Sequence, residues 1–186
     1  NKNNKEFFQN LFNECSNLMQ TIMHLSQPVI AEVCGIAAAA GCQLVASCDL
    51  AVASENASFM TPGVNIGLFC STPMVAVSRN ISRKKIMEML LTGESMSAKD
   101  AVDYGLINHC VPVNQLQDKT MSLANLIASK PISAVKIGKE AFYKQVEMPI
   151  SEAYNYTSEV MAKNMLELDA HEGISAFLEK RLPEWN

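Results

Sequence analysis

Residues 27–53 read QPVIAEVCGIAAAAGCQLVASCDLAVA, and this stretch predicts a strand, a turn, a helix and a second strand at the centre of the fold. The run 29–33 is apolar and rich in β-branched residues, which is the pattern of a strand buried on both faces. The four alanines at 37–40 favour a tight turn, and the segment 42–46 after them can continue as a helix. A second buried strand is expected over 50–53. Strand, turn, helix and strand fit into so few residues only where backbones approach closely, which small side chains permit.

The start of this predicted helix is a candidate oxyanion site. A turn that enters a helix leaves backbone N–H groups without partners, and such groups can hold an oxygen anion. Tight packing of a buried helix start would produce the same spacing of small residues. From the residues alone, both interpretations stay open.

The rest of the chain alternates strands with helices and then continues as helices only. Helices are expected over residues 5–25, 73–77, 82–91, 97–104, 114–129, 132–146, 151–168 and 172–180. Short strands are expected over residues 59–61 and 106–111. This order indicates an α/β core with an α-helical extension. We expect a single domain over residues 1–186, with the core at 1–130 and the helical extension at 131–186.

Composition excludes several classes of protein. The net charge is −4 and the pI about 5.4, so no basic surface is expected that could displace counterions from a nucleic acid. The longest apolar run is too short for a transmembrane helix, so no membrane span is expected. The six cysteines form no Cys-x-x-Cys pair and the three histidines lie far apart, so no metal site is expected. Free thiols of this kind indicate a reducing compartment.

Three segments of the chain carry a resemblance to a known family. They are PVIAEVCGIAAAAGCQLVASCDLAVASENASF at 28–59, MEMLLTGESMSAKDAVDYGLINHCVP at 87–112 and EGISAFLEKRLPEW at 172–185. In this order they resemble the enoyl-CoA hydratase/isomerase (crotonase) family, and the resemblance covers essentially the whole chain. It implies an α/β fold of the crotonase type, with a spiral core of β-β-α repeats and a C-terminal α-helical trimerisation region. It also implies acyl-CoA thioester chemistry at two backbone N–H groups.

The resemblance also locates the acid and base that hydration would need. Hydratases of this family use two carboxylates that share one water, and their positions match Gln43 and Gly63 here. Neither residue can exchange a proton, because an amide does not ionise and glycine has no side chain. One positioned acid or base contributes ~10²–10⁴ in rate. The resemblance therefore implies a family member that lacks both hydratase glutamates and hydrates at or near background.

The oxyanion hole is implied only in part. The family's first backbone donor matches Ala40, and its N–H survives an alanine in place of glycine where the backbone is helical. The second donor lies, in the family, on a loop before the first long helix. Nothing in residues 1–5 resembles that loop, and the family's N-terminal strands are likewise expected to be absent from this chain.

Other polar residues near these positions are expected to be structural. Asp49 matches a Cys-Asp position that we interpret as a backbone hydrogen-bond acceptor, and Glu32 is expected to be paired near a strand end. Cys70 and Ser71 fall where the family has a loop bordering the acyl pocket. A lining role is favoured over a nucleophilic one, because no base or cation is visible beside them in the sequence.

The resemblance implies a second binding region near the C-terminus. Phe177 and Lys180, with Arg181 adjacent, match residues that contact the CoA of a neighbouring subunit, where an aromatic ring suits adenine or pantetheine and a lysine suits phosphate. The alternative is that Phe177 packs into its own core and Lys180 is solvated. A site shared between subunits implies a homotrimer, or a hexamer made of two trimers.

The implied function is that of an enoyl-CoA hydratase/isomerase-like protein that binds acyl-CoA thioesters in fatty-acid metabolism. Any remaining chemistry would use carbonyl polarisation at Ala40, as in isomerisation, thioester hydrolysis or decarboxylation. The alternative is a non-catalytic scaffold or regulatory protein of the crotonase fold. No permanently bound cofactor is expected, and a CoA thioester is the expected substrate or ligand. The mitochondrial matrix is the expected location, because the family has mitochondrial members.

Overall fold

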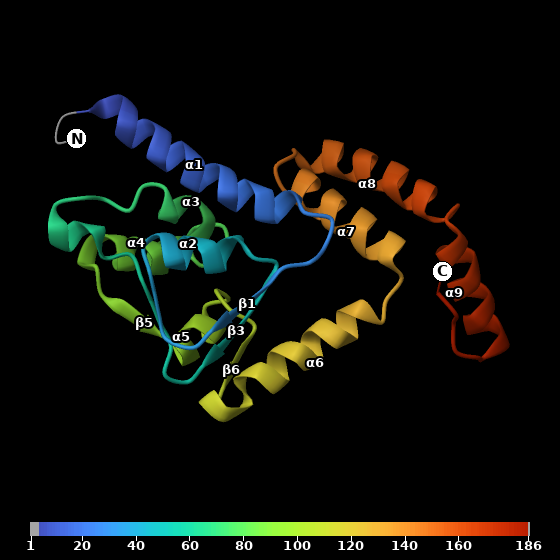
Figure 1. The fold of residues 1–186 in the computed structure, drawn as a ribbon. Coiled ribbons are helices and arrows are strands. Elements are labelled where there is room, and N and C mark those ends of the chain that lie inside the picture. The colour runs from blue at the N-terminus through green and yellow to red at the C-terminus, as the bar shows by residue number, and fades with distance from the viewer. Residues whose placement is uncertain (1–3, 186) are drawn as a thin grey trace. The chain divides into compact units, whose positions relative to one another are not determined.

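The computed structural model describes residues 4–185, which form two compact units (Figure 1). The first unit contains residues up to 23 and residues 29–122, and the second contains the rest. The chain passes from the first unit to the second inside a helix, earlier than residue 130, where the core was expected to end. That the two units act as a single domain stays a prediction.

The first unit contains two three-stranded sheets. The strands are β1 Ile30–Val33, β2 Ile36–Ala38, β3 Leu50–Ser54, β4 Ser58–Met60, β5 Ser95–Ser97 and β6 His109–Val111. One sheet is parallel with the order β1-β3-β6, and in the other β2 and β4 are parallel while β5 is antiparallel to β4. The register places Ala38 beside Met60, so the turn after β2 begins next to the end of β4.

The helices of the first unit connect these strands. They are α1 Lys5–His24, α2 Ala40–Ser47, the 3₁₀ helix η1 Pro62–Ile66, α3 Pro73–Val77, α4 Arg83–Thr92, α5 Ala98–Asp103 and the 3₁₀ helix η2 Val113–Gln115. Two of these helices begin at a capping serine: the Ser97 hydroxyl accepts the Asp100 N–H at 3.1 Å, and Ser82 caps α4 in the same way. Gly93 ends α4 in the left-handed conformation that glycine adopts without strain.

The core of the first unit lies between its sheets and the helices α2 to α5. Its side chains with no exposed surface include Cys42 on α2, Val52 on β3, Phe59 on β4 and Val77 on α3. α2 packs against α3 and against β2. The core therefore fixes the position of α2, whose first residue was identified from the sequence as a candidate oxyanion donor.

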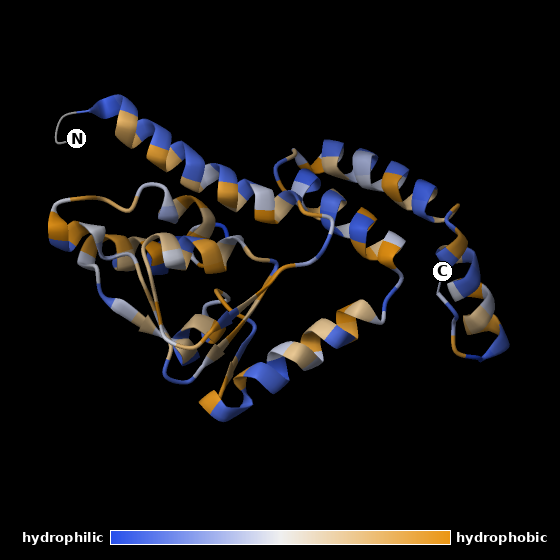
Figure 2. Cartoon of the chain, in the orientation of Figure 1, coloured by the Kyte–Doolittle hydropathy of each residue, from blue (hydrophilic) through white to orange (hydrophobic). Residues whose placement is uncertain are grey.

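The helix α1 leaves most of its large apolar side chains exposed. Apolar and polar residues alternate along it, as the colours in Figure 2 show, but only Met19 is buried. Its large exposed apolar side chains are Phe7, Phe8, Leu11, Phe12 and Leu18, with exposures of 42–53%. The apolar residues of α1 are therefore mostly uncovered among the described residues.

The second unit is helical. Its helices are the end of α6 Leu116–Ala128, then α7 Ile132–Gln145, α8 Ile150–Asn164 and α9 Leu168–Glu179. α7 packs against both α8 and α9, and the Ser133 hydroxyl donates to the buried Asp169 carboxylate at 2.6 Å. Large apolar side chains of this unit are exposed; they include Met161, Met165, Leu166 and Leu168, with exposures of 47–77%.

The predicted α/β class with a helical C-terminal part is confirmed, and the differences are local. A strand, β2, begins inside the small-residue segment that was expected to be a turn, because Ile36–Ala38 pairs with Ser58–Met60. The strand expected over 106–111 is shorter, because the N–H groups of Leu106 and Ile107 donate to Ala101 O and complete the end of α5.

Candidate functional site

The turn between β2 and α2 has an unusual backbone. Ala39 has φ 49° and ψ −112°, and it is one of two non-glycine residues with positive φ among those described. Its N–H donates to Met60 O at 3.0 Å, and its carbonyl accepts the Gln43 N–H at 3.0 Å. These two bonds attach the turn to the end of β4 on one side and to the first turn of α2 on the other.

These bonds also determine the direction of the Ala40 N–H. In a planar trans peptide, the C=O of one residue and the N–H of the next point in opposite directions. The Ala39 carbonyl points along α2 toward Gln43, so the Ala40 N–H points out of the N-terminus of the helix. Ala40 is exposed, and no backbone carbonyl of residues 4–185 accepts its N–H. The arrangement provides a fixed donor for an anion at the position that the sequence predicted.

Gln43, one helical turn further on, has a buried side chain. Its exposure is 4%, and its Oε1 accepts a weak hydrogen bond from the Cys15 Sγ on α1 at 3.8 Å. The residue thus contributes its backbone N–H to the turn and its amide to a contact with α1. Because a neutral amide neither gives nor takes a proton at ordinary pH, this side chain can orient a polar group but cannot act as a base.

Gly63, in η1, is buried beneath Cys70. The Gly63 N–H donates to the Cys70 Sγ at 3.3 Å. A Cβ added to Gly63 would lie 2.9 Å from that sulfur and 3.1 Å from Leu68 O, closer than real Cβ atoms normally approach. The position therefore has no room for a side chain in this conformation. The surrounding atoms occupy the space that a carboxylate side chain would need.

The thiols near this loop are buried and line the core. Burial raises the pKa of Cys42 to about 12, with a further upward contribution from Cys70 and a smaller downward one from a backbone hydrogen bond with Met60. Cys42 is therefore protonated at neutral pH and is not a nucleophile. Cys70 is 8% exposed and accepts the Gly63 N–H, which agrees with the lining role favoured from the sequence.

The other carboxylates considered from the sequence have structural positions. Asp49 Oδ2 accepts the Val29 N–H at 2.6 Å and joins the starts of β1 and β3, so its expected role as a backbone acceptor is confirmed. Glu32 is exposed in β1 and makes no ion pair with another described residue, so the pairing expected for it is wrong.

The C-terminal candidates lie at the end of α9 in the second unit. Phe177 is 81% exposed, which excludes the alternative that it packs into the core of its own chain. Lys180 is exposed and ends α9 in the left-handed conformation, with φ 57°.

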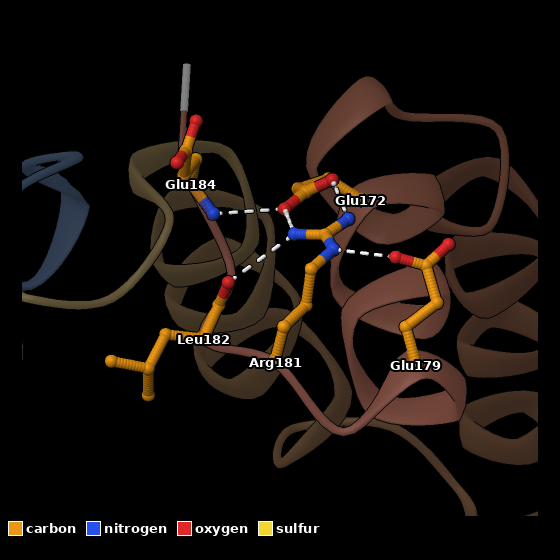
Figure 3. Close-up of polar contacts among 5 residues, drawn as sticks. All are labelled: Glu172, Glu179, Arg181, Leu182 and Glu184. Atoms are coloured by element: carbon orange, nitrogen blue, oxygen red, sulfur yellow. Dashed lines mark hydrogen bonds and ion pairs between the residues drawn. The ribbon is translucent and has the colours of Figure 1, made fainter.

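Arg181 is engaged by carboxylates of its own unit (Figure 3). It donates to both oxygens of Glu172, at 2.6 and 2.9 Å, and to Glu179 at 2.7 Å. Glu172 also accepts the Glu184 N–H at 2.8 Å, so the segment after α9 is held back along the helix. The Arg181 hydrogen bonds, followed by that from Glu184, lower the pKa of Glu172 to about 2, and the carboxylates raise the pKa of Arg181.

Several of these contacts were not predicted. Cys15 belongs to an apolar stripe in the sequence, and Cys70 follows Gly63 through an irregular loop, so neither pattern indicates the partner. Trp185 donates its indole N–H to Ser129 O at 3.0 Å and lies against Gly173, where a Cβ would come within 3.3 Å of the ring. The glycine at 173 was the only sequence signal for this approach, since a helix interior otherwise disfavours glycine.

Within residues 4–185, no group of three or more His, Cys, Asp or Glu side chains could hold a metal ion. No helix in that part of the chain is long and apolar enough to cross a membrane.

A cavity of about 70 Å³ lies near the C-terminal end of α2, between Asp49, Asn80 and Asn108. It does not include Ala40, Gln43 or Gly63.

Comparison with known proteins finds relatives that carry the name of one family, the enoyl-CoA hydratases. The model of the family described as enoyl-CoA hydratase/isomerase matches residues 1–186. The human enoyl-CoA hydratase domain-containing protein 3, mitochondrial, is 50% identical over 182 residues, which are 98% of this chain and 60% of the human protein. A probable enoyl-CoA hydratase, mitochondrial, of Dictyostelium discoideum is 33% identical over 87% of this chain and 59% of its own length. The chain thus spans about 60% of the length of these curated relatives.

Solved structures agree in fold. A crystal structure of an enoyl-CoA hydratase of Mycobacterium smegmatis superposes with a TM-score of 0.97 at 52% identity, covering 98% of this chain and 71% of that one. The crystal structure of the human enoyl-CoA hydratase domain-containing protein 3 gives a TM-score of 0.96 at 49% identity, covering 99% and 73%. The predicted crotonase-type fold is therefore confirmed. By the match over its whole length and by these structures, the chain belongs to the enoyl-CoA hydratase/isomerase family.

Proposed function

We propose that this chain binds the thioester carbonyl of an acyl-CoA at the Ala40 N–H and does not hydrate a carbon–carbon double bond. The observation that carries the proposal is the direction of the Ala40 N–H, which the bond from Gln43 N to Ala39 O fixes at 3.0 Å. A donor that is fixed before the ligand arrives stabilises negative charge on a carbonyl oxygen without reorganisation. One such donor gives weak polarisation, so any rate enhancement should be small.

The absence of hydration follows from the two positions that the family resemblance assigns to the acid and the base. Gln43 is a buried amide in contact with Cys15, and Gly63 has no room for a side chain. Reactions that need only a polarised thioester remain: isomerisation, thioester hydrolysis or decarboxylation, in fatty-acid metabolism. Because the pair is missing, the site favours binding over rapid turnover.

The remaining parts of the proposal concern the whole protein. Phe177 and Lys180 are proposed to contact the CoA of a neighbouring copy, in a homotrimer or a hexamer. Exposure of Phe177 supports this role, since a ring that is 81% exposed is available to a ligand or another subunit. The human and Dictyostelium discoideum relatives carry "mitochondrial" in their names, which supports a mitochondrial location for this protein, and we propose the matrix as its compartment.

The second candidate function is a non-catalytic scaffold or regulatory protein. The packing of Cys70 against Gly63 favours it, because this loop is built without space for an acid. The two functions differ in one measurable property. The first requires recognition of the thioester carbonyl, whereas the second does not.

Calorimetric titration of the 186-residue chain with crotonyl-CoA and with CoA tests the proposal. We expect crotonyl-CoA to bind more tightly than CoA. We also expect no hydration above the background rate, which is measured by the loss of enoyl absorbance. Equal affinity for the two ligands would contradict the proposal that the Ala40 N–H recognises the thioester carbonyl. If neither ligand binds, the result supports the non-catalytic scaffold or regulatory protein. Hydration above background would overturn the interpretation of Gln43 and Gly63.

A further inference from the structure

We infer that the cavity at the C-terminal end of α2 binds a carboxamide group, with Asn80 as the acceptor and Asn108 as the donor of two hydrogen bonds. The cavity has a volume of about 70 Å³ and is lined mainly by polar atoms. All of its lining residues belong to the first unit, and Ala40 is not among them. The inference is therefore independent of the proposed function.

The Asn80 amide is fixed where two helices meet. Its Nδ2 donates to Ala46 O, near the end of α2, and to Ala76 O in α3, each at 2.9 Å. These two carbonyls account for both protons of the amide nitrogen, and they also determine which end of the amide is oxygen. The atom left for a ligand is Oδ1, an acceptor, to which no residue of 4–185 donates.

The Asn108 amide is fixed in the opposite sense. Its Oδ1 accepts the Ala51 N–H at 2.8 Å, while the Asn108 backbone N–H donates to Ala51 O at 2.9 Å. Because both bonds go to one residue of β3, they hold the side chain in a single orientation. The atom left for a ligand is Nδ2, a donor, and none of the described residues accepts from it.

One fixed acceptor and one fixed donor in the same cavity match a carboxamide. This group carries an N–H₂ and a C=O on one planar carbon, so its N–H can donate to Asn80 Oδ1 while its oxygen accepts from Asn108 Nδ2. A carboxylate has no proton for Asn80 at neutral pH, and a cation has no lone pair for Asn108. Asp49, whose Oδ2 accepts the Val29 N–H at 2.6 Å, adds a carboxylate to the lining, which further disfavours an anion.

The cavity is accessible and large enough for this group. Both asparagines are exposed at the surface, and the volume of about 70 Å³ exceeds the roughly 30 Å³ that one water occupies in the liquid. Side chains that are already held in place lose little conformational entropy when a ligand binds. Because the group forms only two hydrogen bonds, we expect a dissociation constant on the order of 10 mM for a carboxamide alone.

Titration of the ¹⁵N-labelled 186-residue chain with acetamide tests the inference, with ¹H–¹⁵N correlation spectra as the readout. We expect saturable shifts of the side-chain N–H₂ resonances of Asn80 and Asn108. Acetate and acetone are the comparison ligands, since each has the size of acetamide and lacks its N–H donor. Neither should produce a saturable shift of these resonances.

Asn108→Asp replaces the donor and keeps the structural bond, because a carboxylate oxygen still accepts the Ala51 N–H. We expect this variant to bind acetamide at least about tenfold more weakly, as followed at the Asn80 resonances. The matched control is Asn155→Asp on the exposed surface of α8, which makes the same change of charge outside the cavity. It should bind acetamide as the wild-type chain does.

Shifts that grow linearly with acetamide, or equal affinity for acetamide and acetone, would overturn the inference on the wild-type chain alone. Equal acetamide affinity of Asn108→Asp and Asn155→Asp would also overturn it. Light scattering then separates two sources of the carboxamide. A smaller assembly for Asn108→Asp than for Asn155→Asp would mean that an Asn or Gln side chain of another copy occupies the cavity, and equal assemblies would mean a free ligand.

Discussion

The backbone N–H of Gly63 donates to the Sγ of Cys70 at 3.3 Å, and the same sulfur fills the space where a side chain at position 63 would begin. A loop that places a thiol in this space leaves no room for a carboxylate at position 63, where the proposed function locates the family's second acid. Substituting glutamate at Gln43 and Gly63 together is therefore no simple restoration of an acid–base pair. The second substitution requires the loop to move.

Gly63→Ala is expected to lower the free energy of unfolding by about 1–3 kcal/mol, since its Cβ would lie 2.9 Å from the Cys70 sulfur. Adding Cys70→Ala should recover part of this loss, while the contact with Leu68 O at 3.1 Å remains. Urea unfolding measures both. The matched control is Gly35→Ala, where no atom lies within 4 Å of the new Cβ and the change should be within about 0.5 kcal/mol. Equal stability of Gly63→Ala and Gly35→Ala would contradict the packing argument.

Gln43→Glu is expected to make stability fall with rising pH. The side chain is 4% exposed, and burial raises the pKa of a carboxyl group in the folded state above its value in the unfolded chain. The folded state then binds more protons than the unfolded state, so the free energy of unfolding decreases as pH rises from about 5 to about 8. Urea unfolding at both pH values measures the effect.

The control for this substitution is Gln117→Glu, on the exposed surface of α6, which should show little dependence on pH over the same range. We also expect no hydratase activity from Gln43→Glu, because Gly63 supplies no second group. Parallel pH profiles for the two variants would show that position 43 is solvated and not buried.

The segment after α9 is expected to detach as pH falls from about 4.5 toward about 2. The pKa of Glu172 is about 2 in the folded state and 4.5 by default, so its pairing with Arg181 stabilises the fold above the higher value and is lost on protonation. The chain has one tryptophan, Trp185, whose indole is bonded to Ser129 O, so its fluorescence should shift to longer wavelength as the segment detaches.

Glu172→Gln should show the shifted fluorescence at neutral pH and lose most of the acid transition. Glu179→Gln removes a single bond to Arg181 from a more exposed carboxylate, so a much smaller change is expected. If the acid transition is unaltered in Glu172→Gln, protonation of Glu172 does not cause the detachment, and other carboxylates do.

Gly173→Ala and Gly138→Ala are a matched pair on two helices. Alanine at Gly138, in α7, meets no atom within 4 Å and should stabilise the fold by about 1 kcal/mol through helix propensity. At Gly173, the new Cβ lies 3.3 Å from two carbons of the Trp185 ring, which must move. We expect a smaller gain or a loss in unfolding free energy there, together with a change in Trp185 fluorescence. Identical gains without a spectral change would mean that the ring does not rest on Gly173.

Much of the fold could be predicted because local patterns and tertiary structure agree. The helix expected over 73–77 is α3, and the cap at Ser97 starts α5. β2 could not be predicted from its residues, since alanine has a low strand propensity and Ile36–Ala38 becomes a strand only through pairing with β4. β5 is short and polar, and it too depends on its partner.

The candidate site divides in the same way. The small residues predicted a turn followed by a helix over 42–46, and only the family resemblance pointed to Ala40, which is the first residue of α2. The unusual backbone of Ala39 could not be predicted, since alanine gives no sign of a positive φ, whereas a glycine at that position would have suggested one. The contacts from Cys15 to Gln43 and from Cys70 to Gly63 join separate elements, so only the tertiary structure identifies them.

The pairing of Arg181 also affects how a polyanion would meet the end of α9. Three carboxylates, Glu172, Glu179 and Glu184, belong to the same part of the chain as the two cations Lys180 and Arg181, and Arg181 is already paired with Glu172 and Glu179. Repulsion between exposed like charges weakens as ionic strength rises. A phosphate group held at this end by Lys180 should therefore bind with little of the salt sensitivity usual for a basic site.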